Sequence, residues 1–126
     1  MQELTIEHYI VYHAKKEKML VFKMNNAASD GWPDRLFVPP SCKHFWIEFK
    51  APGEKCRRLQ SQRIVELIDQ HQDVYVVDNR EKGIEIISFY KKNNGMEPPP
   101  VSRESREAHD SARGGGSLVG SGPGKN

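Results

Sequence analysis

The sequence predicts an α/β fold in which a mixed β-sheet is flanked by helices. Two segments, 3–18 and 59–70, carry apolar residues at helical spacing, and short apolar runs rich in β-branched and aromatic residues lie between and after them. Three such runs in succession, then a helix and further runs, favour a mixed sheet with helices packed on it. No apolar run approaches the roughly 18 residues that a membrane span needs, so we expect a cytoplasmic protein with no membrane partner.

The first half of the chain supplies the first helix and three strands. In residues 3–18, glutamate comes early and lysines come late, an order that suits the helix dipole. Strands are expected at Leu20–Met24, Leu36–Val38 and Phe45–Phe49. The segment Asn25–Pro33 contains several breakers and is expected to be a loop.

The second half of the body adds an amphipathic helix over Leu59–Gln70 and two more strands, at Val74–Val77 and Ile84–Phe89, which Asp78-Asn79-Arg80 separates. The predicted order is therefore α-β-β-β-α-β-β, and its first six elements form an α-β-β-β-α-β core.

Composition divides the 126 residues into a body, 1–96, and a tail, 97–126. The tail holds six of the ten glycines and four of the eight prolines, and its four basic and four acidic residues cancel. Such a segment buries too little apolar surface to offset the entropy of ordering, so we expect it to be disordered. The net charge of +2 then lies on a small body whose core is marginal unless it dimerises.

Three charged residues are expected to meet at one end of the sheet. Glu48 and Lys50 share one face of their predicted strand because side chains alternate with period two, while Ile47 and Phe49 point into the core. Asp34 opens the preceding strand and can converge with Glu48 at the same end. Each fragment alone is more often a surface ion pair or a turn, so the hypothesis depends on their joint arrangement.

Two carboxylates with open coordination positions suit Mg²⁺ or Mn²⁺, which prefer oxygen ligands and retain waters. Such a metal can polarise a phosphate oxygen, and a neighbouring lysine can orient the attacking water or offset growing charge. These are the parts that metal-assisted hydrolysis of a phosphodiester needs.

These motifs resemble a known family. Gly31-Trp32-Pro33-Asp34 and Glu48-Phe49-Lys50 are similar to the PD-(D/E)XK nuclease signature, and the surrounding sequence is closer still to the VRR-NUC group of that superfamily. The further matching segments are Ile6-Glu7, Lys23, Arg35-Leu36, Trp46-Ile47, Ala51-Pro52-Gly53, Arg57-Arg58-Leu59-Gln60 and Val74-Tyr75-Val76-Val77-Asp78. Trp32 departs from the family, in which smaller residues are common at that position.

The resemblance implies a restriction-endonuclease-like core and a Mg²⁺- or Mn²⁺-dependent DNA endonuclease. It implies that Asp34 and Glu48 are the main metal ligands, with the carbonyl of Phe49 as a further one. Lys50 would be the catalytic lysine. Glu7 would match the first-helix acid that helps to place metal or water, and Gln60 would help to hold the site.

The resemblance also implies partners. Single-domain members of the group are viral or bacterial and resemble Holliday-junction resolvases, so a homodimer acting on branched DNA is expected, in the host cytoplasm if the protein is viral. The segment 50–63 has a local charge of +4 beside the expected site, and its DNA contacts would be Lys55, Arg57, Arg58 and Arg63. The alternative is that this segment is only a solvated loop and the start of a helix, without contact to DNA.

Two other functions remain open from the sequence. The chain could be a non-catalytic nucleic-acid-binding module that kept the nuclease fold, although a pure binder has no reason to hold three charged groups together. It could also be an adaptor that presents the proline triplet 98–100 to a partner, for which one triplet is weak support.

Overall fold

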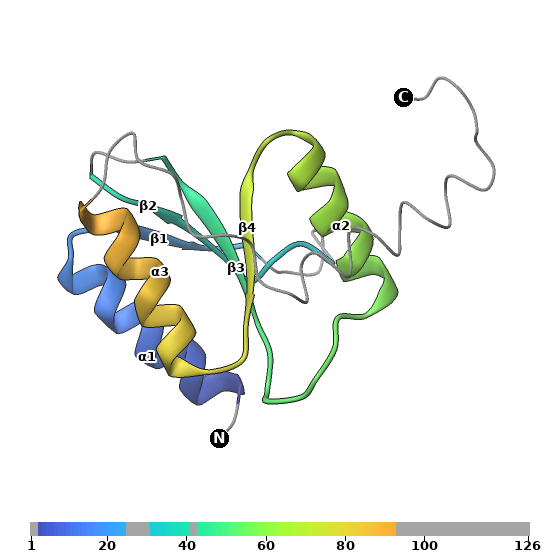
Figure 1. Ribbon diagram of the computed structural model, residues 1–126, viewed down its shortest axis with the longest axis horizontal. Coiled ribbons are helices and arrows are strands. Elements are labelled where there is room, and N and C mark those ends of the chain that lie inside the picture. The colour runs from blue at the N-terminus through green and yellow to red at the C-terminus, as the bar shows by residue number, and fades with distance from the viewer. Residues whose placement is uncertain (1–2, 25–30, 41–42, 93–126) are drawn as a thin grey trace.

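The computed structural model describes residues 3–24, 31–40 and 43–92, and the predicted disordered tail lies outside them. The elements in chain order are α1 (Glu3–Lys16), β1 (Leu20–Lys23), β2 (Arg35–Val38), β3 (Phe45–Phe49), α2 (Arg58–Asp69), β4 (Asp73–Val77) and α3 (Arg80–Lys92) (Figure 1). The strands form one sheet of order β1-β2-β3-β4, antiparallel except for the parallel pair β3–β4. The predicted α/β fold with a mixed sheet is confirmed.

The strand predicted at 84–89 is wrong, because this segment lies within helix α3. The Asp78-Asn79-Arg80 sequence is a helix start and not a connection between two strands, since the Asn79 side-chain oxygen accepts the backbone N–H of Lys82 at 2.8 Å. Helix α3 passes so close to α1 that a Cβ on Gly83 would lie 2.3 Å from Ile10 Cδ1. Tertiary packing on α1 therefore overrides the β propensity of the isoleucines.

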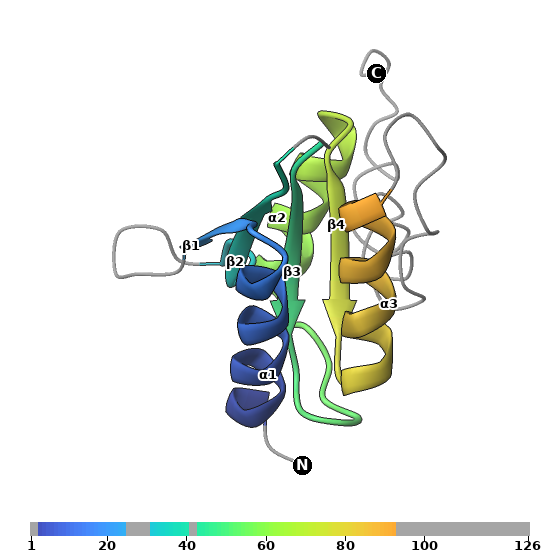
Figure 2. The same cartoon turned by 90° about the vertical axis from the view of Figure 1, so that its left-hand side faces the viewer.

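The two faces of the sheet carry different layers. Helices α1 and α3 lie side by side on one face, and α2 covers β4 on the other (Figures 1 and 2). The larger apolar core fills the space between the sheet and the α1–α3 pair. A smaller cluster of Ile64, Val74 and Val76 seals α2 against β4, with Trp46 packed at its border. The sheet face under α2 therefore has room for polar groups beyond this cluster.

A polar network crosses the larger core. The Phe45 ring stacks on Tyr90 with 4.1 Å between centroids, and the hydroxyls of Tyr75 and Tyr90 are 2.9 Å apart. The Tyr90 hydroxyl also donates a hydrogen bond to Asp73. Burial raises the pKa of Tyr75 to about 12. The pKa of Tyr90 is also raised above its ordinary value, mainly by burial and secondly by the hydrogen bond to Asp73.

These raised pKa values make the protein less stable in alkali. Below pH 10 both phenols are protonated in the folded and unfolded chains, and above it the unfolded chain releases protons that the folded chain retains. The free energy of unfolding should therefore fall as the pH rises from about 10 toward 12, by up to about 1.4 kcal/mol per pH unit for each tyrosine. Urea unfolding between pH 8 and 11 measures this slope. Tyr90→Phe should flatten it, and an equal slope in the variant would contradict the assignment.

Candidate active site

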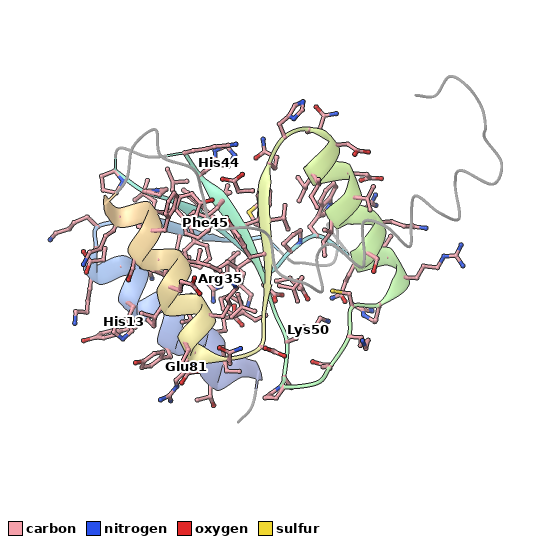
Figure 3. All side chains as sticks on the ribbon, in the orientation of Figure 1. His13, Arg35, His44, Phe45, Lys50 and Glu81 are labelled. Atoms are coloured by element: carbon pink, nitrogen blue, oxygen red, sulfur yellow. The ribbon has the colours of Figure 1, made fainter. Side chains whose placement is uncertain are left out.

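The end of β3 carries a buried ion pair. Lys50 follows the last residue of β3 (Figure 3). Glu48 and Lys50 lie on the sheet face that α2 shares, and Lys50 Nζ is 3.3 Å from Glu48 Oε2, with side chains 7% and 3% exposed for Lys50 and Glu48, respectively. Ile47 and Phe49 belong to the larger core on the opposite face, as the alternation predicts. Desolvating two charges costs more than such a pair commonly returns in stability, so its presence here favours a functional role.

Gln60 of helix α2 holds this pair. Its Nε2 donates to Glu48 Oε2 at 2.9 Å, and its Oε1 accepts from Lys50 Nζ at 2.8 Å. The same oxygen accepts the backbone N–H of Arg57 at 2.8 Å, which ties the site to the first turn of α2. Hydrogen bonds at both its oxygen and its nitrogen thus fix the orientation of the Gln60 side-chain amide. Gln60 is 5% exposed.

Asp34 lies beside Glu48, as the sequence predicts. The pairing of Arg35 with Ile47 puts Asp34 opposite Glu48 at the start of β2. Its Oδ2 accepts the backbone N–H of Phe49 at 2.8 Å, and its own carbonyl accepts the N–H of Met24 at 2.9 Å. The carboxylate is therefore fixed against the last residue of β3, between Glu48 and Lys50 in the chain.

This donor set fits a hard divalent cation. Two carboxylates and the Phe49 carbonyl supply oxygen ligands, and Mg²⁺ commonly binds one or two carboxylates and keeps several waters. Over residues 3–24, 31–40 and 43–92 no group of three or more histidine, cysteine, aspartate or glutamate side chains gathers as a metal cluster. A metal at this place would therefore depend on two side chains, a backbone oxygen and water.

Glu7 is placed differently. Its Oε2 is 2.6 Å from Arg35 Nε, and both side chains are largely buried, at 11% and 17% exposed. Arg35 is paired with Ile47, so this ion pair lies on the sheet face that carries α1 and not on the face of Glu48 and Lys50. The predicted role of Glu7 beside the metal is therefore not supported by a contact with those residues. Arg35 belongs to a segment that matches the family, but the sequence assigns it no role, although a charged residue beside Leu36-Phe37 in a strand was a signal.

The four predicted DNA contacts fall into two groups. Lys55, Arg57 and Arg58 are exposed in the loop before α2 and in its first turn. Arg63 lies further along α2 with its side chain 31% exposed and ion-paired to Glu66. Its guanidinium carbon is 4.7 Å from the centroid of the Trp32 ring. Three of the four side chains are thus open to a ligand, and the fourth is engaged within the protein.

The fold and the site together define an α/β protein with a buried Glu–Lys pair and a half-buried aspartate where two adjacent strands meet. No family model matches the chain. A search of known proteins finds the "Putative nuclease p44" of Acyrthosiphon pisum secondary endosymbiont phage 1, which is 31% identical over 81 residues, or 64% of this chain and 87% of the phage protein. The chain belongs to the family of this phage protein. Within the described residues no helix is long and apolar enough to span a membrane.

Proposed function

We propose that the protein is a nuclease that hydrolyses phosphodiester bonds in DNA with Mg²⁺ or Mn²⁺ as cofactor, and that it is a member of the VRR-NUC group. The observation that carries the proposal is the buried pair Glu48–Lys50, held by Gln60 and flanked by Asp34. The name of the phage relative supports the same class of activity. The family resemblance adds branched DNA, such as a Holliday junction, as the preferred substrate.

In this proposal each residue has a stated task. A divalent ion bound at the site would act as a Lewis acid toward a phosphate oxygen. The carboxylates of Asp34 and Glu48 and the carbonyl of Phe49 would hold this ion. The ammonium of Lys50, 3.3 Å from Glu48 Oε2, orients the attacking water and offsets the charge that grows on the phosphate. Gln60 keeps that ammonium and the Glu48 carboxylate in place.

The exposed basic residues Lys55, Arg57 and Arg58 supply the contacts to DNA phosphates in this proposal. The backbone N–H of Arg57 donates to Gln60, so the segment that carries these side chains is anchored to the proposed catalytic groups. Charge neutralisation by them makes binding weaken with added salt.

The test is cleavage of a labelled four-way junction and of a plain duplex of equal length, with Mg²⁺ and with EDTA. We expect the wild type to cut the junction faster, and Asp34→Asn and EDTA to abolish cutting. Cutting by Asp34→Asn at the wild-type rate would remove Asp34 from the site. Calorimetry with Mn²⁺ distinguishes the alternative, a non-catalytic nucleic-acid-binding module, because such a module gives no heat of metal binding.

We further propose that a second copy of the chain pairs with β1. Strand β1 is at the edge of the sheet, and Leu20 and Phe22 on it are 60% and 48% exposed. The Met24–Asp34 hydrogen bond makes alternate residues of β1 face β2, so the N–H and C=O of Val21 point to the outer edge. Antiparallel pairing centred on Val21 places Leu20 against the second copy's Phe22, and both sites then open on one face of a continuous sheet.

Val21→Pro tests this pairing, because it removes an N–H that points away from β2 and leaves the β1–β2 hydrogen bonds in place. We expect the wild type to sediment as a dimer, and Val21→Pro and Phe22→Lys to sediment as folded monomers. Tyr12→Ala, which removes an exposed aromatic ring from α1, is the control and should remain dimeric. A monomeric wild type, or a dimer that survives Val21→Pro and Phe22→Lys, contradicts the proposal.

A further inference from the structure

Helix α2 contacts both halves of the candidate site. Gln60 binds Glu48 and Lys50, and its neighbours on the same helix hold the loop that ends at Asp34. A Cβ on Gly31 would lie 2.6 Å from Leu59 Cγ and 3.2 Å from Arg63 Cγ, and the φ of Gly31 is +90°. Only glycine allows this loop to lie so close to the helix in that backbone conformation.

The Arg63 side chain closes over this loop. Its guanidinium lies over the Trp32 ring, and its Nη1 is 3.1 Å from Glu66 Oε1 and 3.3 Å from Glu66 Oε2. Its Nε is buried and has no hydrogen-bond partner among the described residues. Of the guanidinium donors, Nη1 is therefore directed at Glu66 and Nε at the protein interior, and neither is presented to a phosphate. Arg58, five residues earlier on α2, is exposed and stacks on no aromatic ring among the ring contacts of the described residues.

We propose that Arg63 is a positioning residue, which fixes Trp32 and thereby the Asp34 carboxylate, and that it is not a phosphate contact. Pro33, buried between Trp32 and Asp34, has a restricted φ that transmits the position of the ring along the chain. The position of the Asp34 carboxylate can be followed through its hydrogen bond with the Phe49 N–H, which is 2.8 Å from Asp34 Oδ2. The inference rests on the proposed function only in treating Asp34 as a metal ligand.

Two adjacent backbone amides report on the position of Asp34 without metal or DNA. The Phe49 N–H is bonded to Asp34, whereas the Lys50 N–H is bonded to the Val77 carbonyl at 2.9 Å. Arg63→Met keeps an unbranched apolar stem along the helix and removes the guanidinium. In this variant we expect hydrogen exchange of the Phe49 amide to accelerate about tenfold relative to the Lys50 amide, the size of effect that loss of one cation–π contact allows. A general loss of stability would accelerate both amides together.

Binding to a labelled duplex at several salt concentrations separates positioning from DNA contact. Loss of one phosphate contact lowers the slope of log K against log salt by about 0.9. We expect Arg63→Met to leave the slope unchanged and the matched control Arg58→Met to reduce it without changing the Phe49 amide. An unchanged Phe49-to-Lys50 exchange ratio in Arg63→Met, or a reduced slope, overturns the inference. A wild type that gives no heat with Mn²⁺ overturns the proposed function instead, and the amide ratio still decides the role of Arg63.

Discussion

Lys50→Ala is expected to slow cleavage of a four-way junction by about 10²- to 10³-fold, the loss measured when a single donor to a transition-state charge is removed. The reason is the position of the ammonium: it is 7% exposed, 3.3 Å from Glu48 Oε2 and 2.8 Å from Gln60 Oε1. Water cannot easily replace a donor in such an enclosed place. Single-turnover rates for the junction and the plain duplex, with Mg²⁺ in excess, measure the effect.

Controls separate catalysis from folding. Lys50→Met retains most of the side-chain volume and should show the same loss of rate as Lys50→Ala, with a smaller loss of stability in urea. Lys15→Ala removes an exposed lysine from helix α1 and should cut at the wild-type rate. If Lys50→Ala cleaves both substrates as fast as the wild type, then Lys50 has no part in the mechanism.

The site could be predicted from the sequence where local rules decide the geometry. Strand alternation put Glu48 and Lys50 on one face, and the short separation of two strands put Asp34 opposite Glu48. Phe49 was predicted to point into the core, and it does so, while its backbone N–H binds Asp34. These relations depend on period and register, which a hydrophobic pattern specifies strongly when one sheet face is buried.

Relations between distant elements could not be predicted in the same way. Helix α3 was taken for a strand because its isoleucines favour β structure, and its contact with Ile10 through Gly83 is visible only in three dimensions. The ion pair of Glu7 with Arg35 joins residues 28 positions apart, and no local rule of the sequence indicates it. Arg63 was counted with the exposed basic residues because charge alone does not reveal a partner such as Trp32.

Gln60→Leu is the second substitution with a large expected effect. The leucine removes one acceptor from Lys50 and from the Arg57 N–H, and one donor from Glu48, in a place that is 5% exposed. Loss of a residue that orients metal ligands typically costs about 10- to 100-fold in metal affinity or activity. We expect a loss of that size in Mn²⁺ affinity by calorimetry, and a loss of about 1–3 kcal/mol in the free energy of unfolding from the polar groups left unpaired.

Gln62→Leu is the matched control, since it makes the same change at an exposed position two residues further along α2 and should alter neither quantity. The double variant Gln60→Leu/Lys50→Met adds a sharper criterion. If Gln60 acts by holding Lys50, the two losses in cleavage rate should be less than multiplicative, because the amide has no ammonium left to position. Independent, multiplicative losses would mean that Gln60 acts on the site through Glu48 or through the first turn of α2, and not through the lysine.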